Sequence, residues 1–121
     1  MSVARLLEAS ARTFGDRPAL SVGDRRIHDY RSLAHRVARL AGGLRSLPML
    51  AGGDRVALVM ANCPQYIELM WAAWHAGLCV VPVNSRLHPR EVRFILENCG
   101  VRYCFATSST ATSLAPLTAD V

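Results

Sequence analysis

The sequence has 121 residues, 51% of them hydrophobic and 19% charged, which is enough apolar material for one folded domain with a core. The formal net charge is +5, and all 14 basic residues are arginines. Because there is no lysine, the chain cannot supply a lysine nucleophile or the lysine of a phosphate-binding loop. The arginines are spread from Arg5 to Arg102 with no basic patch interleaved with aromatics, so the composition does not favour nucleic-acid binding.

The chain shows no targeting or membrane-spanning pattern. Charged or amide residues interrupt every apolar stretch well before the roughly 18 residues that a membrane span requires. Residues 1–9 lack the basic start, apolar core and small-residue cleavage site of a secretory signal. We therefore expect a cytoplasmic protein.

The four cysteines, Cys63, Cys79, Cys99 and Cys104, form no C-x-x-C pair and have no histidine at zinc-ligand spacing. Their pattern predicts buried free thiols in a reducing compartment, with a redox or metal site as the alternative.

The first part of the chain, residues 1–53, predicts a helix, a hairpin and a long helix. Apolar residues recur at helical spacing over residues 3–14. Two short strands, 18–22 and 26–28, are joined by Gly23-Asp24, which is a strong hairpin signal. Asp29 then predicts an N-cap, with its carboxylate accepting from the backbone N–H of Ser32.

The next part, residues 54–106, alternates strands and helices. The apolar runs 55–60, 78–83 and 101–106 predict strands, and helical patterns fill 64–75 and 89–98. Short connections between such elements require parallel strands with right-handed crossovers. The fold class is therefore α/β, a three-layer parallel sheet built from a β-α-β-α-β unit. The helix at 64–75 is apolar nearly all round, so either the preceding helices or a further part of the protein must cover it.

Residues 107–121 form a Ser/Thr-rich tail that we interpret as a loop or frayed end. The tract at 107–113 follows a strand, where phosphate loops often lie, but it contains no glycine to form a tight anion-binding nest. A ligand loop is therefore the weaker interpretation, and a solvated linker the stronger.

No catalytic motif stands out. G-x-G-x-x-G, the phosphate-loop motif and G-x-S-x-G are all absent. The histidines have structural explanations, for example His28 at a strand end. Glu68 is a candidate functional carboxylate, although an exposed helix position is the stronger interpretation.

One positional argument concerns Arg86. Ligands of parallel α/β sheets bind at the carboxyl ends of the strands, which here are residues 61–62, 84–86 and 107–108. Arg86 is the one cation among them, so it is a candidate for binding a phosphate-bearing cofactor. The alternative is that Asn84 and Ser85 shape a turn and Arg86 is a surface charge.

The order of segments resembles the N-terminal region of adenylate-forming (AMP-binding) enzymes, above all fatty-acyl and aromatic-acyl CoA synthetases. The resemblance covers about residues 6–106. It is carried by Pro18-Ala19-Leu20, Tyr30, Leu33, Gly53-Asp54-Arg55-Val56-Ala57, Asn62, Ala76-Gly77, Val81-Pro82-Val83-Asn84, Arg86-Leu87, Glu91 and Ile95-Leu96. Each piece is weak alone, and their order and spacing make the likeness fairly specific.

The resemblance implies that the chain is part of an acid–thiol ligase that uses ATP, Mg²⁺ and CoA. The family often has Thr where Asp29 stands, and both residues can cap a helix. The family's catalytic signatures (a Ser/Thr/Gly-rich loop with its lysine, a Thr-Glu pair, a ribose-binding Asp and a C-terminal lysine) are absent here. No catalytic or metal-binding residue can therefore be assigned, and we expect the 121 residues alone to be inactive and to bind no cofactor.

Two other hypotheses stay open. One is a standalone α/β interaction module without catalysis, forming a homodimer through exposed apolar surface. The other, more distant, is a nucleotide-binding domain of flavodoxin type. The sequence does not indicate the acyl substrate.

Overall fold

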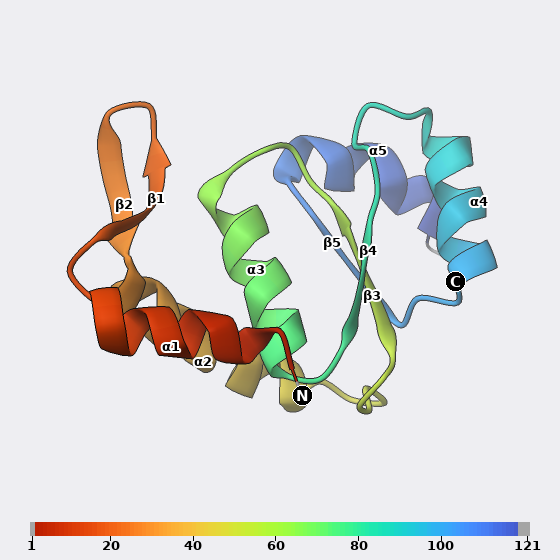
Figure 1. Ribbon diagram of the computed structural model, residues 1–121. Coiled ribbons are helices and arrows are strands. Elements are labelled where there is room, and N and C mark those ends of the chain that lie inside the picture. The colour runs from red at the N-terminus through yellow and green to blue at the C-terminus, as the bar shows by residue number, and fades with distance from the viewer. Residues whose placement is uncertain (1, 119–121) are drawn as a thin grey trace.

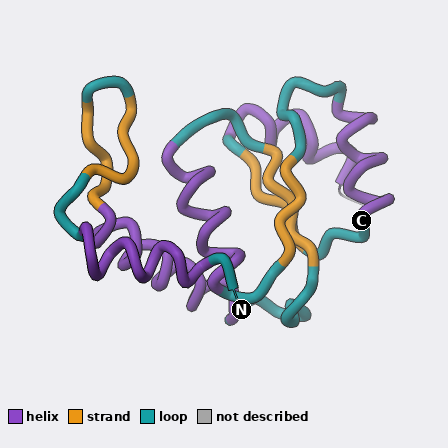
Figure 2. Tube along the Cα trace, viewed as in Figure 1, coloured by secondary structure: helices purple, strands orange, loops and turns teal. Residues whose placement is uncertain are grey.

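A computed structural model describes residues 2–118 (Figures 1 and 2). The first part of the chain forms a helix, an antiparallel hairpin and a long helix, as the sequence predicts. Their bounds are α1 Ala4–Phe14, β1 Pro18–Val22, β2 Arg25–Asp29 and α2 Tyr30–Arg45. We call residues 1–53 the lead-in.

The second part forms the predicted β-α-β-α-β unit. Its elements are β3 Arg55–Val59, α3 Pro64–His75, β4 Cys79–Pro82, α4 Pro89–Cys99 and β5 Tyr103–Ala106. All three strands are parallel, in the order β4-β3-β5. Pro82 is the last residue of the edge strand β4, where its missing N–H leaves no gap inside the sheet.

Helices cover both faces of this sheet (Figure 1). Side chains alternate along the central strand, so Val56 packs in a cluster with residues of α1, α2 and α3, while Ala57 and Val59 pack with residues of α4 and α5. All three are fully buried. The three-layer arrangement thus follows from an apolar strand that has two faces to bury.

Helix α3 is covered by the lead-in. Its small residues Ala72 and Ala73 are buried in the cluster that includes Leu33, Val37 and Leu44 of α2. The start of α2 is fixed as predicted, because the Asp29 carboxylate accepts the Ser32 N–H at 2.7 Å. This bond, together with the hydroxyl of Ser32, lowers the pKa of Asp29.

The expectation of a loop or frayed end after residue 106 is wrong for the described residues. A further helix, α5 (Ser108–Thr118), follows β5 and lies against α4. Leu114 is 4% exposed in the apolar cluster of that sheet face. Ser and Thr have only moderate helix propensity, so burial of an apolar side chain outweighs the local preference that the sequence pattern reflects.

The expectation that the cysteines are buried is also wrong. All four thiols are free, but Cys79 and Cys104 are exposed, and Cys63 and Cys99 are only partly buried. Cys79 and Cys104 belong to the two outer strands, which have a neighbour on one side only among the described residues. Partial burial of its sulfur still raises the pKa of the Cys104 thiol.

Candidate functional site

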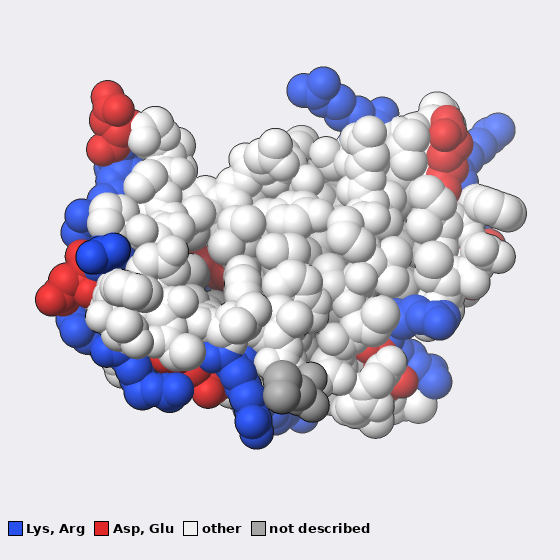
Figure 3. Space-filling model, viewed as in Figure 1, with Lys and Arg blue, Asp and Glu red and all other residues white. Residues whose placement is uncertain are grey.

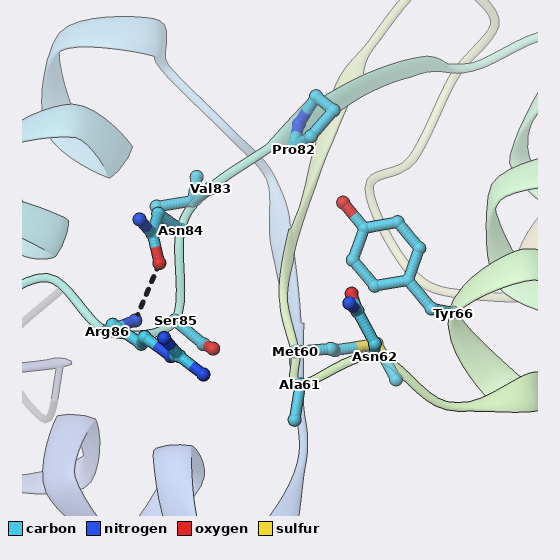
Figure 4. Close-up of a pocket in the computed structure, with 9 residues that line it drawn as sticks. All are labelled: Met60, Ala61, Asn62, Tyr66, Pro82, Val83, Asn84, Ser85 and Arg86. Carbon is cyan, nitrogen blue, oxygen red and sulfur yellow. Dashed lines mark hydrogen bonds between the residues drawn. The ribbon is translucent and has the colours of Figure 1, made fainter.

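An open cavity of about 610 Å³ lies at the carboxyl ends of β3 and β4 (Figure 4). This is the edge of the sheet at which the sequence places ligand-binding residues. The cavity is lined by Met60, Ala61, Asn62, Tyr66, Pro82, Val83, Asn84, Ser85 and Arg86. The figure shows Tyr66 on one side of the strand ends and Arg86 with Asn84 on the other.

A local turn positions Arg86. After β4 ends, the Asn84 side-chain oxygen accepts the backbone N–H of Arg86 at 2.9 Å, and the Asn84 carbonyl accepts from Leu87 at 3.2 Å. Side-chain-to-backbone bonds of this kind are how Asn stabilises turns. The structure therefore confirms that Asn84 shapes a turn, and that turn leaves Arg86 at the cavity; phosphate binding by Arg86 stays a prediction.

The three predicted strand ends come together. Besides the residues of β3 and β4, Thr107 lies beside this edge, where its hydroxyl accepts the Ala61 N–H at 3.4 Å. The Arg86 guanidinium has no hydrogen-bond or ion-pair partner among the residues that the structure describes. One cation with amide and hydroxyl groups around it is a suitable lining for a phosphate or carboxylate.

Sequence reasoning missed Tyr66. This residue lies in the first turn of α3, directly after the loop that follows β3. The signal that could have indicated Tyr66 is its position. It is an aromatic residue with a polar hydroxyl, and it lies in the first turn of a largely apolar helix, close to a strand end.

A second polar cluster joins the lead-in to α3. Glu68 is only 6% exposed, so the expectation of an exposed helix carboxylate is wrong. Its carboxylate contacts His28 Nε2 at 2.7 Å and Arg36 Nε at 3.5 Å. A buried carboxylate needs such partners to offset the loss of hydration, and they come from β2 and α2. The pairing links residues 40 positions apart, which helical spacing alone does not reveal.

The same cluster resembles a hydrolytic triad, because His28 Nδ1 lies 2.9 Å from the Ser32 hydroxyl. A hydrolase also needs free N–H groups to stabilise an oxyanion. At this helix start the backbone N–H groups of Tyr30, Arg31 and Ser32 already donate to the Arg17 carbonyl, the Gly15 carbonyl and the Asp29 carboxylate. The cluster is therefore an internal support that holds β2, α2 and α3 together.

No set of three or more potential ligand residues (His, Cys, Asp or Glu) gathers within residues 2–118 as a metal site would require. None of the helices in this part of the chain is both long and apolar enough to cross a membrane.

Comparison with known families gives a match along nearly the whole chain. The family described as AMP-binding enzyme matches residues 7–121. A feruloyl-CoA synthase from Amycolatopsis is 40% identical over 90 residues, covering 74% of this chain and 18% of that protein. A long-chain-fatty-acid–CoA ligase from Salmonella typhimurium is 34% identical over 114 residues, covering 93% of this chain and 20% of that protein. The chain thus spans about one fifth of the length of these curated relatives.

Solved structures give the same result. A long-chain-fatty-acid CoA ligase from Rhodopseudomonas palustris aligns with a TM-score of 0.84 at 31% identity, covering 97% of this chain and 30% of that chain. A fatty acyl CoA synthetase from Mycobacterium tuberculosis aligns with a TM-score of 0.83 at 29% identity, covering 99% and 24%. The predicted partial α/β domain is confirmed by these alignments.

Proposed function

Because the chain belongs to the AMP-binding enzyme family, we propose that it is the N-terminal part of an ATP-dependent acyl-CoA synthetase. The longer protein would convert a carboxylate and ATP to an acyl-adenylate, and then transfer the acyl group to CoA. The observation that carries the proposal is the match over residues 7–121 together with CoA ligases among the relatives. The proposed partners are the remainder of the ligase and a small carboxylic acid substrate, and a cytoplasmic location stays a prediction.

We further propose that the 121 residues alone are catalytically inactive. Adenylation turns a carboxylate, a poor electrophile, into one with a good leaving group, and the phosphate charge that develops requires cations and fixed donors. This chain has no lysine, and its described residues gather no group of three or more potential metal ligands (His, Cys, Asp or Glu). The test is a coupled pyrophosphate-release assay with ATP, Mg²⁺, CoA and a panel of fatty and aromatic acids. Turnover above the buffer rate would contradict the proposal.

Arg86 is the residue that we propose for contact with a phosphate-bearing cosubstrate, ATP or CoA. Its support is the cavity, the turn made by Asn84 and the lack of a described partner for the guanidinium. A charge-assisted hydrogen bond contributes about 1.5–3 kcal/mol, so Arg86→Ala should weaken binding by about tenfold or more.

Equilibrium dialysis of the longer ligase with ATP and with CoA measures this effect, because the 121 residues alone are expected to bind no cofactor. Arg90→Ala is the matched control, because Arg90 is exposed on α4 outside this cavity. Equal affinity in wild type and Arg86→Ala would assign Arg86 to the surface. Tighter binding of FMN than of ATP or CoA would instead favour a flavodoxin-type domain.

The second candidate function is a noncatalytic assembly module that forms a homodimer. One observation favours it: Phe94 on α4 is 68% exposed and lines an open hollow together with Ile95, so apolar surface is available there. Sedimentation equilibrium of wild type and Phe94→Ser separates the two. Association that depends on concentration and disappears with Phe94→Ser supports the dimer, and a monomer at all concentrations excludes it.

A further inference from the structure

The polar cluster around Glu68 also holds a serine that is open to solvent. Ser32 is exposed in the first turn of α2, and its hydroxyl lies 2.9 Å from His28 Nδ1. On the other side of the imidazole, Nε2 contacts the Glu68 carboxylate at 2.7 Å. The side chains of His28 and Glu68 are only 16% and 8% exposed. A hydroxyl, an imidazole and a carboxylate are therefore connected in that order from the surface to the interior. In the space-filling view, carboxylate and arginine side chains of the lead-in surround the same end of the molecule (Figure 3).

Glu68 determines which nitrogen of the neutral imidazole carries the proton. An ionised carboxylate can only accept hydrogen bonds, so the Nε2 that contacts it must be the donor. Nδ1 then keeps its lone pair, and it is the atom that faces the Ser32 hydroxyl. In this arrangement the imidazole can take the proton of the serine and make its oxygen nucleophilic.

Arg36 supplies a cation next to the serine. It lies one turn after Ser32 on α2, so the two side chains are neighbours on the helix surface. Its Nε contacts Glu68 at 3.5 Å, and its two Nη groups have no partner among the residues that the structure describes. These N–H groups can donate to an oxygen that becomes negative beside Ser32. The backbone N–H groups at this helix start already have acceptors, so the support for an oxyanion is partial.

We propose that Ser32 is a nucleophile that is acylated once by compounds with an activated acyl group, such as an ester or mixed anhydride with a good leaving group. The Ser32 oxygen attacks the carbonyl carbon, and its proton passes to His28 Nδ1. As the new oxygen–carbon bond forms, the bond from the carbonyl carbon to the leaving group breaks, and the leaving group departs with that electron pair. Glu68 stabilises the imidazolium, which then gives its proton to the leaving group or to water.

The partial support for the oxyanion limits the reaction to one acyl group per chain. Attack on an activated acyl group needs less stabilisation, because its leaving group departs readily. Hydrolysis of the resulting serine ester has a poor leaving group and lacks a full set of oxyanion donors, so it is slow. The cluster therefore forms a modification site and not a hydrolase. This proposal does not depend on the proposed ligase function.

Acetylation by p-nitrophenyl acetate tests the proposal on the 121-residue chain. The four free thiols are first blocked with iodoacetamide. Because the chain has no lysine, no side-chain amine competes for the reagent. We expect release of about one equivalent of p-nitrophenolate followed by a plateau. Peptide mapping by mass spectrometry should place the acetyl group on Ser32.

Ser46 is the control within the same sample. It is an exposed serine at the other end of α2, and its hydroxyl donates to the Gly43 carbonyl instead of an imidazole. A general base accelerates proton transfer by about 10²–10⁴-fold, so Ser32 should be acetylated about 100-fold faster than Ser46. Ser32→Ala should abolish the release of p-nitrophenolate before the plateau, and Ser46→Ala should leave it unchanged. Equal labelling of the two serines, or release that survives Ser32→Ala, would overturn the proposal.

His28→Gln separates the chemistry of the imidazole from its structural role. The Gln amide can still donate a hydrogen bond to Glu68, but it cannot take a proton from Ser32. Labelling of Ser32 should therefore fall to the level of Ser46, while circular dichroism shows a folded protein. Labelling that is unchanged in His28→Gln would overturn the proposal, and so would turnover that continues past the plateau, because it would mean a hydrolase.

Arg36→Gln tests the support for the oxyanion. The guanidinium is 46% exposed and so acts partly through water, and we expect its loss to slow the acetylation of Ser32 by about tenfold. Arg39→Gln is the matched control, because Arg39 is exposed on the same helix and contacts none of the three other groups among the described residues. Equal slowing by the two variants would mean that the overall positive charge attracts the reagent, and would overturn the role given to Arg36.

Discussion

The lead-in (residues 1–53) and the β-α-β-α-β unit of residues 54–106, which we call the sheet unit, differ in where their polar residues lie. In the lead-in, all nine arginines are exposed and the charge excess is +5, although α1 also exposes Leu6 and Phe14. In the sheet unit, the central strand is buried on both faces, and the polar residues of the cavity gather where the strands end. The sheet unit therefore offers a concave site made of a few groups, and the lead-in offers a broad charged exterior. The two parts are joined by packing of α2 on α3 and by the Glu68 cluster.

The packing of α2 on α3 should give the largest effect. Leu33 is 4% exposed in the cluster shared by the two parts, so Leu33→Ala should lower the free energy of unfolding by about 2–5 kcal/mol. Leu6→Ala is the matched control, because Leu6 is 64% exposed and its truncation leaves no cavity. Urea denaturation measures both. Similar losses in the two variants would mean that the lead-in is not packed on the sheet unit as described.

Removing His28 from the polar cluster that joins the lead-in to α3 should have the next largest effect on stability. His28→Ala removes the nearest partner of the buried Glu68 carboxylate and leaves only Arg36, at 3.5 Å. Removing the nearest hydrogen-bond partner of a buried carboxylate is strongly destabilising, and we expect a loss of about 3 kcal/mol in urea denaturation.

Ser32→Ala provides the comparison for His28→Ala. It removes the hydroxyl's contacts with the imidazole and with the Asp29 carbonyl but leaves the Glu68 carboxylate paired, so its cost should be about 1 kcal/mol. If Ser32→Ala destabilised the protein as much as His28→Ala, the contact of the imidazole with the Ser32 hydroxyl, and not its pairing with the buried Glu68 carboxylate, would account for the stability that His28 contributes.

Replacing a glycine by alanine should change the stability in opposite directions in the two parts. Gly100 ends α4 in the left-handed region with φ of 64°, so Gly100→Ala should destabilise by about 1 kcal/mol. Gly42 lies within α2 and has an ordinary helical position, so Gly42→Ala should stabilise by about 0.5–1 kcal/mol. A Cβ at either position meets no atom within 4 Å, so the backbone alone decides the sign. Thermal unfolding measures both, and a shift of the same sign in the two variants would contradict the expectation.

The sequence predicts the fold well where a signal is local. The hairpin at Gly23-Asp24, the cap at Asp29, the stop at Gly100 and the helix Pro64–His75 each depend on neighbouring residues, and the structure confirms all four. Prediction from the sequence fails where burial between residues far apart in the chain determines the structure. Leu114 stabilises a helix in a Ser/Thr-rich stretch by packing on the sheet, and His28 meets Glu68 only after α2 has packed on α3.

The candidate site shows the same limit. Because the carboxyl ends of parallel strands meet at one edge of a sheet, the sequence predicts that residues 61–62, 84–86 and 107 lie together, and the structure confirms this. The rule says nothing of Tyr66, because its place depends on how α3 enters from the loop after β3. The division of the chain at residues 53 and 106 stays a prediction, since the fold gives the elements and not their independence.

The smallest effect concerns pH and the cap of α2. The Ser32 N–H holds the pKa of Asp29 below its ordinary value of 3.8, because the bond favours the charged carboxylate. A group whose pKa is lowered by folding adds stability that is present above the ordinary pKa and is lost as the pH falls through the folded-state pKa. Asp29→Asn keeps a side-chain cap that does not titrate, since Asn and Asp cap helices about equally well. The difference in Tm between wild type and Asp29→Asn should therefore stay constant from about pH 7 to about pH 5, and wild type should lose stability relative to the variant only below pH 3.8. A difference that changes between pH 7 and pH 5 would mean that the carboxylate titrates above its ordinary range, and that the charge of the lead-in, not the cap, governs its response to acid.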